Sequence, residues 1–235
     1  DVSGNGNDAT QGTTGSQPTF ISSSASFNGM PAVNFDSDFL NTSAIASLNA
    51  NVISWFTASK LNSVPVSGDR GLMTTNTSLR INQYGQYIKA NQYGHFVQNA
   101  SYHLNENPVG LGLTPAQMVL PRLHSNIWKS NGDLMFFMDG SLVGSKTGIN
   151  QIAGTHNYTR LGAYANNPAI NFWRGDLAEI FAYTIDINSA QNIIVTNYMS
   201  TKYGITCGTS DRYSHDGTHG NELAGIGRED ASNQH

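Results

Sequence analysis

Apolar residues in this sequence come in short runs separated by Gly, Asn, Asp, Ser and Thr. Short apolar runs bounded by turn residues are typical of β-strands. The strongest run is 51–59, where Ile53 and Trp55 alternate with Val52 and Phe56, so that both faces are apolar. A strand of this kind is covered on both sides. The pattern therefore predicts that 51–59 lies in the centre of a sheet.

A hairpin is indicated further along the chain, where the apolar runs 134–138 and 141–143 flank Asp139 and Gly140. Asp-Gly is a preferred pair for a type I′ turn, which requires positive φ at both central residues. The sequence therefore predicts two paired strands joined by a two-residue turn.

Weaker runs of the same kind predict the remaining strands. They are 20–21, 32–35, 122–129, 160–164 and 175–183, with several alternating segments between 69 and 98. The first 17 residues carry almost no apolar side chain, which is typical of loops and turns.

One helix is expected after the last predicted strand. Asn188 or Ser189 is suited to cap its start, and apolar residues follow at helical spacing. Gly204 is suited to end it. Beyond Cys207 the sequence becomes polar and charged. We therefore expect a folded domain over 1–206 and a polar tail, or the start of a following segment, over 207–235.

Composition narrows the class of protein. Only 12% of the 235 residues are charged, so the surface must be built from Asn, Ser, Thr, Gln and Gly, which favour turns and strand edges. The net charge of −4, without a basic block, argues against nucleic acid as a partner. No run approaches the roughly 18 apolar residues of a membrane span. The single cysteine cannot form an intramolecular disulfide.

Three segments, 3–9, 27–36 and 175–205, resemble in content and order the laminin-G-like domains of the concanavalin A-like lectin and glucanase superfamily. Many bacterial surface proteins carry such domains. The resemblance implies an all-β jelly-roll sandwich of two antiparallel sheets with one short C-terminal helix. It also implies a noncatalytic extracellular module for adhesion or carbohydrate binding, with a glycan or surface polymer as its partner.

The sequence departs from that family at its start, because family members usually have an apolar, Trp-containing strand before the segment that resembles 3–9. An unpaired sheet edge invites a strand from a neighbouring chain. The alternative function is therefore a structural subunit that assembles by strand exchange into a fibre or surface layer, with 223–226 as the donor. The simpler interpretation is that the tail closes its own sheet. The segment 221–232 resembles the linker that follows such modules in larger surface proteins.

A third function, glycoside hydrolase or lyase, depends on Asp176 and Glu179 in the last predicted strand. Retaining glycosidases need two carboxylates about 5 Å apart. The odd spacing places these two on opposite faces of a regular strand, although a bulge would bring them together. The family resemblance implies a structural role for the acid in this strand, and we expect no catalysis.

Calcium is the cofactor that the acidic loop residues suggest. Asp36 and Asp38 offer hard oxygen ligands, which Asn5 or Asp8 could join across the fold. The same side chains commonly form Asx-turns, and we favour that interpretation.

A second metal site is conceivable near the end of the chain. His215, Asp216, His219 and Glu222 are ligand types that suit zinc. A solvated tail explains them more simply.

Carbohydrate binding needs an aromatic ring beside planar polar groups. Tyr164 and Trp173 flank Asn166 and Asn167, and these four residues are the candidate ligand contacts. Packing of the loop explains the two aromatic residues equally well.

Overall fold

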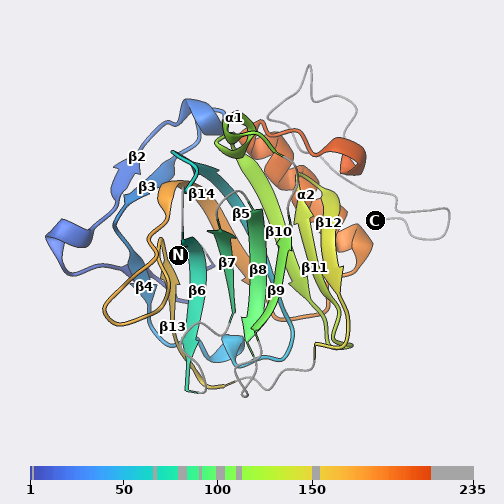
Figure 1. Cartoon of the computed structure of the whole chain (residues 1–235), viewed down its shortest axis with the longest axis horizontal. Helices are drawn as coiled ribbons and strands as arrows, with labels where there is room; N and C mark the ends of the chain where they lie inside the picture. Colours follow the sequence, from blue (N-terminus) through green and yellow to red (C-terminus); the bar gives the residue numbers. More distant parts are fainter. Residues whose placement is uncertain are drawn as a thin grey trace.

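In the computed structural model, the described residues form two antiparallel sheets of seven strands each, which face one another as a sandwich (Figure 1). The structure describes residues 1, 3–65, 68–78, 84–89, 92–98, 104–109, 113–149 and 154–212. The expected jelly-roll sandwich with a C-terminal helix is confirmed.

The strands of each sheet come from distant parts of the chain. Sheet A has the order β1 (Ala9–Thr10), β4 (Leu40–Thr42), β13 (His156–Leu161), β6 (Asp69–Thr77), β7 (Tyr84–Lys89), β8 (Gln92–Gln98) and β9 (Leu104–Val109). Sheet B has the order β12 (Ser141–Lys146), β11 (Leu134–Met138), β10 (Arg122–Trp128), β5 (Ile53–Leu61), β14 (Arg174–Tyr183), β3 (Ala32–Asp36) and β2 (Thr19–Ile21).

In the described part of the chain, four short helical elements lie between strands, and two more follow the last strand. They are η1 (Thr14–Ser16), η2 (Ala25–Phe27), η3 (Ala46–Leu48), α1 (Pro115–Met118), α2 (Ser189–Tyr203) and η4 (Gly208–Ser210). Helix α2 packs against β10, and Figure 1 shows it on the side of the molecule away from β4 and β13. Among the described residues, no helix is both long and apolar enough to cross a membrane.

Strand β5 lies in the middle of sheet B, between β10 and β14, as its two apolar faces predict. Ile53 and Leu61 are buried in the core between the sheets. Phe56 and Ala58 point the other way, into a second core where Met199 of α2 packs against sheet B. The sandwich therefore has three layers at this strand.

The predicted hairpin joins β11 to β12. Asp139 has φ 48° and Gly140 has φ 77°, as a type I′ turn requires. The Asp139 carboxylate also accepts a hydrogen bond from the backbone N–H of Leu123 at 2.9 Å. This contact ties the turn to the start of β10.

Helix α2 begins and ends where its capping residues indicate. Asn188 and Gln191 form a reciprocal capping box, and Gly204 ends the helix in the left-handed conformation, with φ 65°. The helical spacing of Ile194 and Tyr198 predicted that both belong to the packed face of α2. This prediction is wrong, because Ile194 and Tyr198 are 47% and 38% exposed.

The described chain stays in contact with the sandwich beyond Thr206. Cys207 is buried, and Ser210 Oγ donates to the carbonyl oxygen of Gly140 at 2.6 Å. Asn197 of α2 donates to the carbonyl of Ser210 at 2.7 Å and accepts from the backbone N–H of Arg212 at 2.8 Å. The sandwich thus makes contacts as far as Arg212. The tail candidates His215, Asp216, His219 and Glu222, and the donor segment 223–226, lie outside the described residues.

Candidate functional site

The loop 162–173 connects β13 of sheet A to β14 of sheet B and carries all four predicted ligand residues. The backbone N–H of Tyr164 donates to the carbonyl of Ile170 at 3.0 Å, and the N–H of Gly71 donates to the carbonyl of Asn171 at 2.9 Å. These bonds fold the loop back on itself and fasten it to β6. The loop therefore presents its side chains from a fixed position.

The side chain of Arg160, near the end of β13, donates hydrogen bonds to the backbone of this loop. Its Nη1 donates to the carbonyls of Tyr164, at 3.1 Å, and Asn166, and its Nε donates to Asn41 Oδ1 at 2.8 Å. The guanidinium also lies 4.3 Å from the centre of the Phe39 ring. Burial lowers the pKa of the Arg160 guanidinium, and Tyr158 acts in the opposite direction. A buried Arg that donates to two loop carbonyls makes the loop conformation rigid.

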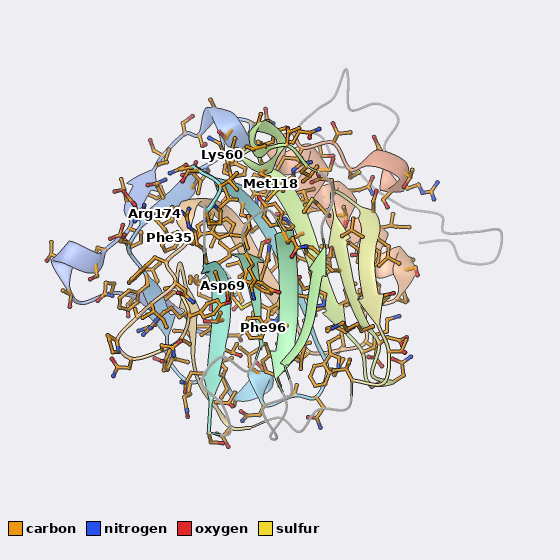
Figure 2. All side chains as sticks on the ribbon, in the orientation of Figure 1. Phe35, Lys60, Asp69, Phe96, Met118 and Arg174 are labelled. Atoms are coloured by element: carbon orange, nitrogen blue, oxygen red, sulfur yellow. The ribbon has the colours of Figure 1, made fainter. Side chains whose placement is uncertain are left out.

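Tyr164 is half-buried: its ring packs against Phe96, and its hydroxyl lies near the Asp69 carboxylate. Its ring makes an edge contact with Phe96, with 6.1 Å between centres, and its hydroxyl lies 3.4 Å from Asp69 Oδ2. Gly71 makes room for the ring, since a Cβ there would lie 2.3 Å from it. Asp69 and Phe96 are labelled in Figure 2. Sequence reasoning missed both, together with Arg160, because they come from other strands.

The two asparagines of the loop lie at its outer part. Asn166 is half-buried, whereas Asn167 and Pro168 are exposed. Phe96 is buried and supports the Tyr164 ring. We call Tyr164, Asn166, Asn167 and Asp69 the Tyr164 site. It combines an aromatic ring, a carboxylate and amides, which are the groups that contact the C–H faces and hydroxyls of sugars.

Trp173 does not belong to this site, which corrects its prediction as a ligand residue. Its side chain is fully buried in the core between the sheets, against residues such as Phe35 and Leu72. The backbone N–H of Trp173 donates to the carbonyl of Gly162 at 2.8 Å, which closes the loop at its base. The ring therefore fills the core and cannot meet a ligand.

The four calcium candidates each make other local contacts. Asp38 accepts from the backbone N–H of Asp36, two residues before it, at 3.0 Å, and Asp36 Oδ1 lies 3.5 Å from Arg174 Nε. Asp8 accepts from the amino group of Asp1 at 2.6 Å, and Asn5 donates to Ser3 Oγ at 3.1 Å.

No cluster of three or more metal-ligating His, Cys, Asp or Glu side chains occurs in the part of the chain that the structure describes. The hydrogen bond of Asp38 is not that of an Asx-turn, because its carboxylate accepts from the residue two positions before it, whereas an Asx-turn uses the N–H two positions after it. Calcium binding stays a prediction for these residues.

A β-bulge changes the geometry of the acid pair in β14. Asp176 pairs with Lys60 and Glu179 pairs with Ala58, with a register shift between Leu177 and Glu179. Because Lys60 and Ala58 are two positions apart on β5, Asp176 and Glu179 lie on the same face of sheet B.

Both acids in this pair have structural partners. Asp176 accepts from Asn34 Nδ2 at 2.6 Å. Glu179 accepts from Lys202 Nζ at 2.9 Å and from the Tyr203 hydroxyl at 3.0 Å, which fastens α2 to the sheet. Burial lowers the pKa of Lys202, but hydrogen bonds to Tyr198 and Glu179 outweigh it, so that the pKa is raised.

We expect Glu179→Gln to lower the free energy of unfolding by about 1–2 kcal/mol, because it leaves the Lys202 ammonium without its carboxylate partner. The urea midpoint measures the change. Asp8→Asn, whose side chain is 69% exposed, is the control and should change the midpoint little. An unchanged midpoint for Glu179→Gln would contradict a structural role.

No protein-family model matches this chain, and no curated protein sequence is significantly similar to it. Solved structures do match in fold. The binding domain of botulinum neurotoxin DC, in complex with SialylT, superposes with a TM-score of 0.60 and 8% identity, over 80% of this chain and 47% of that chain. The present chain thus spans about half the length of the toxin binding domain.

Two smaller proteins match as well. The CBM40 domain of Ruminococcus gnavus IT-sialidase, bound to alpha2,3 sialyllactose, has a TM-score of 0.52 and 12% identity, over 66% of this chain and 92% of that chain. A heptameric SAP-like pentraxin from Limulus polyphemus has a TM-score of 0.52 and 11% identity, over 82% of this chain and 80% of that chain. The chain therefore shares the lectin-like jelly-roll fold of these domains.

Proposed function

We propose that this protein is a noncatalytic glycan-binding module and that the glycan binds at the Tyr164 site. The observation that carries the proposal is a partly exposed Tyr164 in a loop held by several hydrogen bonds, with the Asp69 carboxylate at its hydroxyl and with Asn166 and Asn167 further along the same loop. A preorganised site loses little conformational entropy when it binds a ligand.

The fold supports the same proposal. Two domains of this fold were solved with SialylT and with alpha2,3 sialyllactose, respectively. As a laminin-G-like module, the protein would act outside the cell, in adhesion at a bacterial surface.

We expect Tyr164→Ala to weaken glycan binding at least tenfold, which corresponds to about 1.4 kcal/mol. The measurement is a glycan array with and without calcium, followed by calorimetry on the best ligand. Asn167→Ala, in an exposed part of the loop, should weaken binding without a change in stability.

Tyr183→Ala is the matched control, because this tyrosine is 39% exposed but lies on β14, at the end of sheet B. Equal losses for Tyr164→Ala and Tyr183→Ala would place the ligand elsewhere. Absence of any glycan selectivity would overturn the proposed function. A binding signal that requires calcium would support the ligand role of Asp36, Asp38, Asn5 and Asp8.

One observation favours the alternative of assembly by strand exchange. Among the described strands β2 lies at the edge of sheet B, and its residue Phe20 is 68% exposed. An open edge with an exposed aromatic residue is a template for another strand. Light scattering distinguishes this alternative, because a monomer has a mass of 25.3 kDa and an assembly has a multiple of it.

A further inference from the structure

Four polar side chains of sheet A lie next to the loop 162–173 and form a square. Tyr158 and Arg160 are two positions apart on β13, and Thr74 and Asn76 are two positions apart on β6, so each pair shares one face of its strand. In the register of the two strands, Tyr158 lies opposite Asn76 and Arg160 lies opposite Thr74. We call these four residues the donor square.

The donor square donates hydrogen bonds to four consecutive backbone carbonyls of the loop, those of residues 163–166. The bonds run from Thr74 Oγ1 to Ala163 at 3.2 Å, from Arg160 Nη1 to Tyr164 at 3.1 Å and to Asn166, from Tyr158 Oη to Ala165 at 2.7 Å, and from Asn76 Nδ2 to Ala165 at 3.5 Å. All four side chains thus hold the segment that carries Tyr164 and Asn166.

The segment 163–166 needs these donors because it belongs to neither a helix nor a named strand. Its carbonyls therefore lack the regular backbone partners that a helix or a sheet supplies. Ala163 and Ala165 are fully buried, and a buried carbonyl without a partner costs free energy. Loss of a donor therefore favours other conformations of the segment, in which these carbonyls reach water.

We propose that Tyr158 and Thr74 are positioning residues of the Tyr164 site, which fix the loop for a glycan without contacting the glycan. Their bonds to Ala165 and Ala163 fix the backbone on both sides of Tyr164, and this backbone sets the direction of the Tyr164 ring. A loop that is ordered before binding loses less conformational entropy when it binds, so its donors increase the affinity. The inference rests on the proposed function and extends it from the loop to sheet A.

Tyr158→Phe tests the inference by the removal of a single oxygen atom. The ring stays in place, with its centre 5.4 Å from the Arg160 guanidinium. We expect the backbone amide of Tyr164, which donates to Ile170, to exchange with solvent about fivefold to tenfold faster, because the folded loop loses one hydrogen bond. We expect the dissociation constant of the glycan that binds best on the array to rise by a similar factor.

Tyr84→Phe is the matched control. The Tyr84 hydroxyl also donates to a backbone carbonyl, that of Ala50, at 2.9 Å, but this contact lies outside the loop 162–173 and the donor square. The control should lower Tm as Tyr158→Phe does, and it should change neither the exchange of the Tyr164 amide nor the affinity for the glycan. Equal effects of the two variants on the loop would overturn the inference, because they would trace the change to a general loss of stability.

Thr74 allows a test by rescue. Thr74→Val keeps the shape of the side chain but removes the hydroxyl that donates to Ala163, whereas Thr74→Ser keeps the hydroxyl and removes a methyl group. We expect faster exchange of the Tyr164 amide and weaker glycan binding for Thr74→Val, and values near those of the wild type for Thr74→Ser. The opposite order would show that the methyl group fixes the loop, which contradicts the inference.

The two measurements separate this inference from the proposed function. Unchanged exchange of the Tyr164 amide in Tyr158→Phe would overturn the inference, whether or not a glycan binds. Faster exchange with an unchanged dissociation constant would also overturn it, because the order of the loop would then not serve binding. Absence of glycan binding by the wild type would overturn the proposed function, while the exchange rates still report whether the donor square fixes the loop.

Discussion

Gly175→Ala is expected to destabilise the protein by at least about 3 kcal/mol, which lowers Tm by roughly 6–12 °C for a domain of this size. Gly175 pairs with Phe35 of β3 on one side and Leu61 of β5 on the other. A Cβ at Gly175 would lie 2.0 Å from the carbonyl oxygen of Lys60 and 2.9 Å from Leu61 Cα. Because both contacts are backbone atoms in a central strand, no side-chain movement relieves them. Thermal unfolding measures the loss.

Gly12→Ala is the matched control, since nothing lies within 4 Å of a Cβ at that position. It should leave Tm nearly unchanged. Figure 2 labels three neighbours of Gly175: Phe35, which pairs with it, Lys60, whose carbonyl oxygen approaches it, and Arg174, which precedes it in the chain. A Tm shift of similar size for both variants would show that the close approach to Lys60 does not limit residue 175.

Acid is expected to destabilise the fold strongly through two buried histidines, His95 of β8 and His124 of β10. The pKa of each is lowered by burial to about 3 in the folded state, against about 6.5 when unfolded. Their stabilising contribution is therefore complete above pH 6.5 and is lost progressively as the pH falls from 6.5 towards 3. At pH 5 the loss amounts to about 2 kcal/mol per histidine, or about 4 kcal/mol for the pair, relative to pH 8. Urea denaturation at a series of pH values measures it.

The variant His124→Leu isolates one half of this effect. It should remove about 2 kcal/mol of the difference between pH 8 and pH 5, which is the contribution of one histidine, whatever its effect at pH 8. Parallel curves of unfolding free energy against pH for the variant and the wild type would contradict the assignment of His124 as a buried neutral group.

Features that depend on neighbouring residues could be predicted from the sequence. The turn at Asp139 and Gly140 needs only two positive φ angles, and the ends of α2 need only Asn188, Gln191 and Gly204. The central position of β5 followed from its two apolar faces. Each of these signals lies within a few residues of the element that it specifies.

Features that depend on distant residues could not be predicted. The bulge after Leu177, which brings Asp176 and Glu179 to one face of β14, depends on the register with β5. The exposure of Ile194 and Tyr198 depends on which face of α2 meets sheet B. Registers and packing faces are set by tertiary contacts, which periodicity alone does not specify.

The candidate site shows the same division. Tyr164, Asn166 and Asn167 were found because they are adjacent in one loop. Arg160 and Asp69 reach the loop from different strands of sheet A, and no local pattern marks either of them. Trp173 is an aromatic residue of the same loop as Tyr164, but its side chain is buried in the core. The sequence of the loop does not distinguish the two positions.

Cys207 gives this protein a built-in reporter. It is the single cysteine of the chain, it is 1% exposed, and it directly precedes η4, which holds the β11–β12 turn through Ser210. A thiol reagent can reach its sulfur only when this corner detaches from the sandwich. The rate of thiol labelling thus records local opening at this corner in the wild-type chain, without an introduced probe.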